Sequence, residues 1–200
     1  LFGLTWVSFL THHSPDMIRI DRTYGTAVLT GVLLAVSFPG RQVYPLAWCA
    51  LAPLLVVSRR TSPGGTAGLF FVAGWTFYSV LLQWLLANVY WAGGWAIVGQ
   101  QLLVLVMAAY WALLGWLYGG FFRGRGWREL VALPFLWTGM ELVQSVLFTG
   151  FGWGALGYSQ GANLAAAQWA AIGGVSLVSF FVVLVNTLLA AGLFRGKKGF

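Results

Sequence analysis

The stretch WAIVGQQLLVLVMAAYWALLGWLYGGFF, which is Trp95–Phe122, contains no charged side chain and is followed directly by Arg123. A helix needs about 20 apolar residues to cross a hydrocarbon core of about 30 Å. Because a helix rises about 1.5 Å per residue, this stretch exceeds that length, and such a helix must tilt or project from the bilayer. The stretch predicts a membrane-spanning helix.

The composition of the whole chain agrees with a membrane protein. Of its 200 residues, 60% are hydrophobic and only 8% are charged, and the mean hydropathy is +0.82. A soluble domain carries about 25% charged residues, so this chain cannot cover its surface with charge. Its net charge of +7 comes from short basic clusters between apolar runs. Such clusters are typical of loops in membrane proteins, and they do not indicate nucleic-acid binding.

Five further apolar runs accompany the first. They are Tyr24–Phe38, Tyr44–Val57, Thr66–Ala87, Leu130–Phe148 and Val175–Phe194. We therefore predict an all-α fold, a polytopic bundle of about six transmembrane helices over residues 24–194. Residues 1–23 form a cytoplasmic or interfacial segment, and residues 195–200 form a basic end.

Proline and glycine mark breaks in this pattern. Pro45 and Pro53 indicate that the second run is distorted. The first two runs are short, so they form either two tilted spans or a hairpin that enters the bilayer and returns. Gly173 and Gly174 predict a break before the last span. The spacing of Gly115 and Gly119 predicts close helix packing within the bundle.

Basic residues alternate with uncharged loops along the chain. They precede the first span and follow the second, fourth and sixth, at Arg19, Arg22, Arg59, Arg60, Arg123, Arg125, Arg128, Arg195, Lys197 and Lys198. Loops 88–94 and 149–163 carry no charge, and only Arg41 breaks the alternation. The positive-inside rule then makes the charged loops and both termini cytoplasmic. Glu129 is expected in such a cytoplasmic loop.

Aromatic residues gather at one outward end. Trp84, Tyr90, Trp91 and Trp95 lie around the uncharged loop 88–94. This grouping is typical of the aromatic belt at a membrane interface.

Glu141 is the one acidic residue inside a predicted span. An ionised carboxylate there costs at least a few kcal/mol, so such a residue usually faces the bundle interior. No basic residue of its own span can pair with it, and desolvation disfavours the charged form. It is either a hydrogen-bonding residue between helices or part of a polar lining for a lipid headgroup or a proton-linked pathway.

A second candidate site is the loop at residues 148–160, here called the aromatic loop. It is uncharged and rich in glycine and aromatic residues. It can lie flat at the headgroup layer and bring backbone N–H groups close to a ligand. With Trp84 and Glu141, its candidate lipid-binding residues are Gly150, Trp153, Tyr158, Ser159 and Gln160.

Catalytic and metal-binding signals are weak. The adjacent His12 and His13 point apart on a helix, and no other histidine exists, so we expect no metal site. Cys49 is the only cysteine and has no histidine or basic partner in its own span, so it lacks an activating base. We expect no cofactor and no catalytic residue within this chain.

Several motifs resemble the membrane domain of bacterial apolipoprotein N-acyltransferases. The most specific are LPFLWTGME at 133–141, LFTGFGW at 147–153 and GYSQ at 157–160; SFP at 37–39, YPLAW at 44–48, Trp84 with Gly93-Gly94, and IGGV at 172–175 support them in the same order. Two positions depart from the family pattern. Gln144 stands where an arginine is usual, and Gly152 stands where a proline is usual, which indicates a divergent member.

The resemblance implies an enzyme of the bacterial inner membrane. The family transfers an acyl chain from a phospholipid to the N-terminal diacylglyceryl-cysteine of a lipoprotein, so phospholipid and diacylated lipoprotein are the implied partners. The family's catalytic Glu, Lys and Cys belong to a nitrilase-like domain after a seventh span. We therefore expect this chain to end before that span and to be inactive alone. The alternatives are a small polytopic transporter, a lipid-binding membrane module or a structural membrane subunit.

Overall fold

The computed structural model describes residues 15–40, 43–147 and 150–196, and these form helices and connecting turns without a strand. His12, His13, Arg41, Thr149, Lys197 and Lys198 lie outside the described residues. The long helices are α2 (Pro15–Val36), α5 (Pro63–Leu81), α7 (Trp95–Leu117), α8 (Trp127–Val146) and α10 (Ala170–Gly196). The short ones are η1 (Tyr44–Leu46), α3 (Ala47–Ala50), α4 (Ala52–Ser58), η2 (Gln83–Asn88), α6 (Val89–Ala92), the π-helical turn η3 (Tyr118–Phe122), η5 (Leu156–Gln160) and α9 (Leu164–Ala167).

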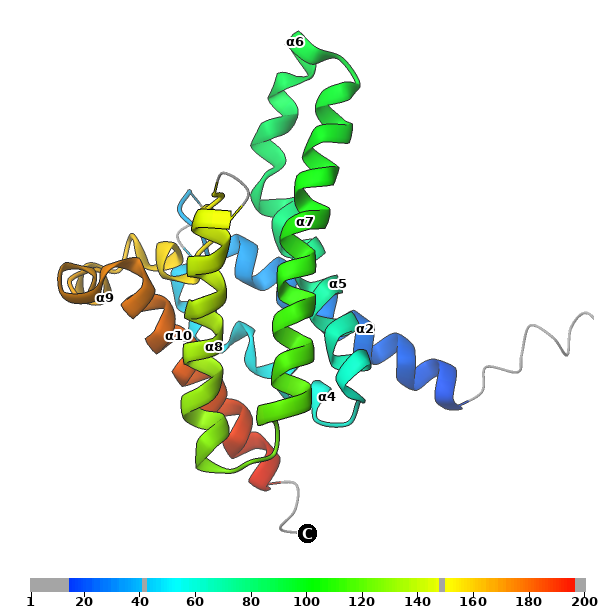
Figure 1. Cartoon of the computed structure of the whole chain (residues 1–200), viewed down its shortest axis with the longest axis vertical. Helices are drawn as coiled ribbons and strands as arrows, with labels where there is room; N and C mark the ends of the chain where they lie inside the picture. The colour runs from blue at the N-terminus through cyan, green and yellow to red at the C-terminus, as the bar shows by residue number, and fades with distance from the viewer. Residues whose placement is uncertain (1–14, 41–42, 148–149, 197–200) are drawn as a thin grey trace, which may run out of the picture.

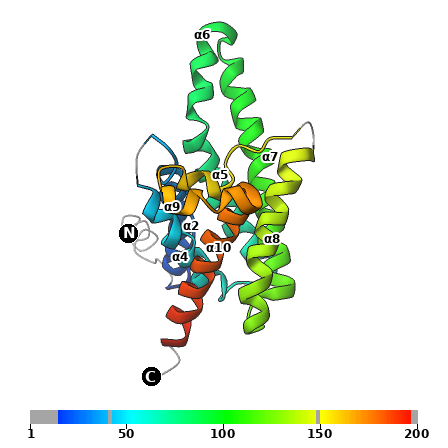
Figure 2. The ribbon, with the colours of Figure 1, turned by 90° about the vertical axis from the view of Figure 1, so that its left-hand side faces the viewer.

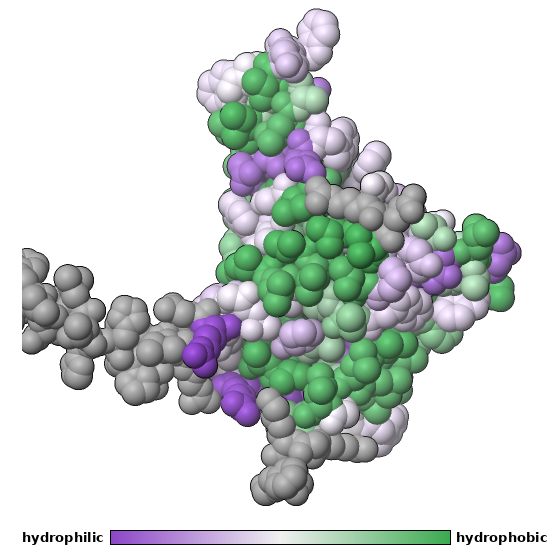
Figure 3. All heavy atoms as spheres, turned by 180° about the vertical axis from the view of Figure 1, so that it is seen from behind, coloured by the Kyte–Doolittle hydropathy of each residue, from purple (hydrophilic) through white to green (hydrophobic). Residues whose placement is uncertain are grey.

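The helical fold class is confirmed, while the number of spans stays a prediction. Within the described residues, three helices are long and apolar enough to cross a membrane: Pro63–Leu81, Trp95–Phe122 and Ala170–Phe194. Arg22–Val36 and Tyr44–Ser58 are shorter apolar helices. Seen from behind, hydrophobic side chains cover much of the visible flank (Figure 3), as a surface in contact with acyl chains requires.

The predicted boundary between residues 23 and 24 stays a prediction, and the helix that contains it begins at Pro15. The predicted position of Glu129 needs correction. Glu129 is not in a loop: it lies in the first turn of α8, with only 3% of its surface exposed. A carboxylate can be buried there because basic and hydroxyl groups from neighbouring segments bind it, as described below.

Helices α5 and α7 pack side by side, and the end of this pair that carries η2 and α6 stands out from the rest of the bundle as a hairpin, with α6 at its tip (Figures 1 and 2). Glycines allow α5 and α7 to pack closely. A Cβ atom on Gly115 would lie 2.7 Å from the Phe70 ring, and one on Gly74 would lie 2.9 Å from Trp111. Gly119 approaches Thr66 in the same way. The predicted packing role of Gly115 and Gly119 within the bundle is confirmed.

The second apolar run is broken, as Pro45 and Pro53 predicted, into η1, α3 and α4. Asn186 of α10 enters the break at Leu51. Its Oδ1 atom accepts from Leu51 N and Ala52 N at 2.9 and 3.0 Å, and its Nδ2 atom donates to Ala47 O at 2.8 Å. The amide thus binds backbone groups that the interrupted helix leaves without their usual partners.

The last helix also has its predicted break. Gly173 and Gly174 have non-helical backbone angles inside α10, and Gly174 has a φ of +66°. A positive φ favours glycine. The kink separates a short N-terminal turn from the long apolar part of α10.

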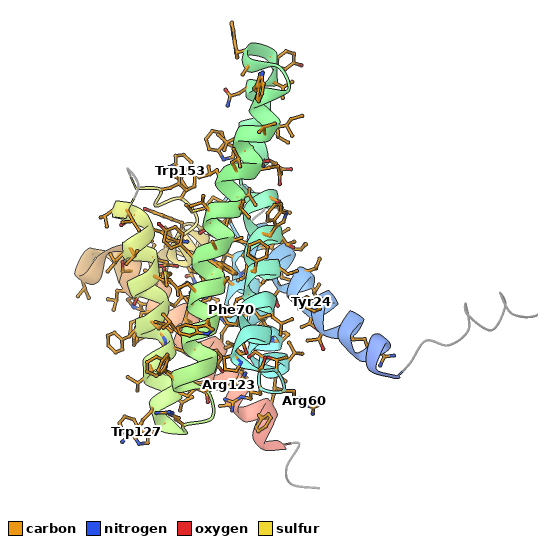
Figure 4. The ribbon with its side chains drawn as sticks, turned by 45° about the vertical axis from the view of Figure 1, so that its right-hand side comes forward. Tyr24, Arg60, Phe70, Arg123, Trp127 and Trp153 are labelled. Atoms are coloured by element: carbon orange, nitrogen blue, oxygen red, sulfur yellow. The ribbon has the colours of Figure 1, made fainter. Side chains whose placement is uncertain are left out.

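A polar cluster joins helix ends at the end of the bundle opposite the α5–α7 hairpin, where Figure 4 labels Arg123 and Arg60. Glu129 forms an ion pair with Arg59 and accepts hydrogen bonds from Tyr118 Oη at 2.6 Å and from Gly124 N at 2.9 Å. Arg123 donates to Ser58 O at 2.6 Å and to Thr66 Oγ1 at 2.8 Å. These bonds explain how Glu129 is buried.

Candidate functional site

A cavity of about 680 Å³ lies at the base of the α5–α7 hairpin, between three segments that are distant in the sequence. These are the turn after α2, the end of α5 with the start of η2, and the aromatic loop. The lining residues are Phe38, Pro39, Leu81, Trp84, Gly152, Trp153, Gly154 and Tyr158. Three of the seven predicted site residues, Trp84, Trp153 and Tyr158, therefore line one cavity.

Two tryptophans from different segments meet at this cavity. The rings of Trp84 and Trp153 lie 5.3 Å apart between centroids, at an interplanar angle of 36°. Both remain exposed, at 49% and 61%, and Tyr158 is exposed at 50%. Figure 4 labels Trp153 beside the base of the hairpin. Indole and phenol rings combine a large apolar surface with one polar group, so this rim suits the boundary between acyl chains and headgroups.

Two glycines give the aromatic loop its course. Gly154 has a φ of +99°, and a Cβ atom there would lie 2.8 Å from the ring of Tyr78. Glycine is therefore needed for the loop to lie against α5 beside the cavity. Gly150 has a φ of +76° and turns the chain after α8, where its N–H donates to Leu147 O at 3.0 Å. It is not a lining residue, so its contribution is to the backbone turn.

Ser159 and Gln160 are buried, each with 1% of its surface exposed. Gln160 accepts from Trp48 Nε1 at 2.8 Å and donates to Tyr44 O and Ser159 Oγ, each at 3.0 Å. Ser159 Oγ donates to Leu156 O at 2.6 Å. These polar groups bind other parts of the fold instead of facing the cavity. Their geometry suits a role in holding the loop.

Glu141 is likewise not a cavity-lining residue. Its Oε1 atom accepts from Trp137 Nε1 at 2.8 Å and from Leu156 N at 2.9 Å. Its Oε2 atom is buried and has no hydrogen-bond partner among the described residues. The carboxyl group thus links α8 to the aromatic loop, which corresponds to the hydrogen-bonding alternative for this residue.

Five of the lining residues were not predicted as site residues from the sequence: Phe38, Pro39, Leu81, Gly152 and Gly154. The predicted topology indicates how these residues could have been found. It places the loops after the first, third and fifth spans on the same outward side. Residues next to those three loops can therefore meet. The contact between Trp48 and Gln160 could not be predicted in this way, because it joins positions 112 apart in the sequence and no local sequence pattern indicates it.

Cys49, the only thiol of the chain, lies on α3. Its Sγ atom donates to Leu46 O at 3.5 Å, and its side chain is exposed. It is not among the residues that line the cavity. The residues that line the cavity are mostly apolar or aromatic, and they include no thiol nucleophile.

A strongly apolar helical bundle with a cavity rimmed by tryptophan and tyrosine is typical of a membrane protein with a cavity near the bilayer interface. The chain belongs to the apolipoprotein N-acyltransferase family, because the model of the apolipoprotein N-acyltransferase N-terminal domain matches residues 30–188.

Curated relatives named apolipoprotein N-acyltransferase agree with this assignment. The protein of Geobacter metallireducens is 40% identical over 193 residues, which cover 93% of this chain and 36% of the relative. Those of Chlorobaculum tepidum and Pasteurella multocida are 34% and 29% identical, over 90% of this chain and 33% and 34% of the relatives. The chain therefore spans about a third of the length of these relatives. The family match does not favour the transporter alternative.

Proposed function

We propose that this chain is the membrane domain of an apolipoprotein N-acyltransferase. The complete enzyme transfers an acyl chain from a phospholipid to the N-terminal diacylglyceryl-cysteine of a bacterial lipoprotein. The observation that carries the proposal is the family match over residues 30–188. The apolar cavity at the base of the hairpin supports it independently of the sequence match.

The proposed role of the cavity is to bind the acyl part of a lipid substrate. Its volume of about 680 Å³ falls within the range typical of small-molecule sites. Burying each CH₂ group of an acyl chain contributes about 0.8 kcal/mol, so a wall of Phe38, Leu81 and Trp84 can hold several such groups. Trp153 and Tyr158 then lie at the rim, where the polar part of the lipid emerges.

The proposed location is the bacterial inner membrane, with both termini in the cytoplasm. The labelled basic residues support this orientation, because Arg60 and Arg123 lie at the end opposite the hairpin (Figure 4). No charged residue occurs from Thr61 to Phe122, the segment that contains the hairpin. With this orientation the cavity opens toward the outer leaflet, where both lipid-anchored substrates can meet it by lateral diffusion.

The experiment that tests this function uses the full-length protein that contains the chain. We expect Trp153→Ala to reduce acyl transfer to a diacylated lipopeptide about tenfold, because it removes a large aromatic side chain from the rim of the lipid site. Trp116→Ala is the matched control, since Trp116 is exposed on α7 and does not line the cavity. The triacylated product is quantified by mass spectrometry. Equal losses in the two variants would exclude the cavity as the substrate site.

A further inference from the structure

We propose that Glu141 is a positioning residue of the lipid site: through its bond to Leu156 N, its carboxyl group holds the aromatic loop where Trp153 and Tyr158 line the cavity. This inference rests on the proposed function of the cavity. Glu141 itself does not line the cavity, so it acts through the loop and not through contact with the lipid.

The loop is attached to two helices by consecutive backbone amides. Leu156 N donates to Glu141 Oε1 of α8 at 2.9 Å, and Gly157 N donates to Ser179 Oγ of α10 at 2.8 Å. Gly157 lies so close to α10 that a Cβ atom would collide with the backbone at Val175. These contacts fix residues 156–157, which lie between the cavity-lining residues Gly154 and Tyr158.

The contact with Glu141 also determines where the part of the loop that contains Trp153 lies. Leu156 is fully buried, and Gly154 packs against the ring of Tyr78 on α5. Without an acceptor, Leu156 N would be a buried unpaired donor, which costs about 1–3 kcal/mol. The loop can avoid that cost by moving toward solvent, and the movement would separate Trp153 from Trp84.

A single carboxyl oxygen of Glu141 makes the contact that holds the loop. Oε1 accepts both hydrogen bonds, from Leu156 N and from Trp137 Nε1, while Oε2 has no partner among the described residues. An amide oxygen can accept the same two bonds. The arrangement therefore predicts that Glu141→Gln keeps the loop in place and that Glu141→Leu releases it.

The test is photolabelling of the full-length protein in liposomes that contain phosphatidylethanolamine with a diazirine on one acyl chain. Labelling of residues 150–158 is divided by labelling of the exposed α7 surface around Leu105 and Val106, which serves as an internal reference for contact with bulk lipid. We expect Glu141→Leu to lower this ratio about fivefold or more, which corresponds to at least about 1 kcal/mol. We expect Glu141→Gln to restore it.

Two further variants separate positioning from general destabilisation. Thr138→Val lies on the same helix, but Thr138 Oγ1 bonds only within α8, to Pro134 O and Phe135 O, so the ratio should not change. Ser179→Ala removes the acceptor of Gly157 N from a different helix, and the ratio should fall as in Glu141→Leu. If Glu141→Leu does not fold, Glu141→Ala takes its place, because it also removes the acceptor of Leu156 N and should lower the ratio in the same way.

The outcomes distinguish the two proposals. A wild-type protein without enriched labelling of residues 150–158 would overturn the lipid site, and the role of Glu141 with it. Enriched wild-type labelling that Glu141→Leu and Ser179→Ala leave unchanged would overturn only the positioning role. Failure of Glu141→Gln to restore labelling would show that the acceptor geometry of Oε1 is not the cause.

Discussion

Several buried polar side chains of this bundle bind backbone groups at breaks and turns of the chain. Asn186 is the clearest case, since its amide bonds to Ala47 O, Leu51 N and Ala52 N at the break between α3 and α4. Water is scarce inside a membrane-embedded bundle, so unpaired backbone groups there are costly. A buried amide on α10 therefore makes a broken helix possible.

We expect Asn186→Ala to lower the free energy of unfolding by about 2 kcal/mol, because it leaves buried backbone groups of the break without partners. The measurement is equilibrium unfolding of the protein in mixed detergent micelles. Thr187→Val is the control. Thr187 is equally buried, but its hydroxyl bonds to Val183 O of its own helix. A similar loss in both variants would mean that burial, and not the break, explains the effect.

Helices were easier to predict from this sequence than the contacts between them. The run Trp95–Phe122 appears as helix throughout, because its apolar length leaves no other way to satisfy its backbone in a bilayer. Helix ends were less predictable. The run that starts at Thr66 leaves regular α-helix at Leu81 and continues as the 3₁₀ turn η2. Glu129 was misplaced because its partners Arg59 and Tyr118 are brought to it only by the tertiary fold.

The candidate site could be predicted only in part, because its local sequence signals were visible and its long-range contacts were not. Trp84, Trp153 and Tyr158 were selected because large aromatic residues beside uncharged loops are a local signal, and all three line the cavity. Ser159 and Gln160 were selected because they are polar residues in the same loop. Their burial depends on Trp48 and on the backbone at Tyr44, which lie far away in sequence. Residue type alone does not distinguish a polar group that faces a ligand from one that binds the fold.

The cluster around Glu129 holds helix ends together, and its removal should be costly. We expect Glu129→Ala to lower the free energy of unfolding by about 3–5 kcal/mol, because it leaves Arg59 buried without its counter-ion. The double variant Arg59→Ala with Glu129→Ala should lose less than the sum of the two single changes. Unfolding in mixed micelles measures all three. Arg60→Ala, an exposed neighbour, should stay near the wild-type value, and additive losses at Arg59 and Glu129 would contradict a coupled pair.

The molecule as a whole is electrically asymmetric, and this asymmetry sets its proposed orientation. In a Cys49→Ala background, we expect Gly94→Cys and Gly161→Cys to react with a membrane-impermeant thiol reagent from the periplasmic side. Gly64→Cys should react only after the membrane is permeabilised. All three glycines have negative φ values and surroundings without close contacts, so the substitutions should not strain the backbone. The opposite labelling pattern would reverse the proposed topology.

This polypeptide alone should bind lipid without catalysing acyl transfer. A thioester route needs a nucleophilic thiol, a base and an oxyanion donor that converge on one site. Cys49 is outside the cavity lining, Glu129 is bound at the opposite end, and Glu141 is engaged with the aromatic loop. Glu129, Glu141 and Cys49 therefore do not meet at the cavity.

The measurement uses the purified 200-residue chain, reconstituted with phospholipid and a diacylated lipopeptide, and mass spectrometry to detect the triacylated product. We expect no product from the chain alone. Product should appear when the chain is fused to the remaining two thirds of the Geobacter metallireducens relative, to which it is 40% identical in the shared region. The same fusion with Trp153→Ala should form less product, because the lipid site would be impaired. Turnover by the chain alone that disappears with Cys49→Ala would place the nucleophile in the membrane domain, and it would overturn both the proposed division of labour and the proposed topology.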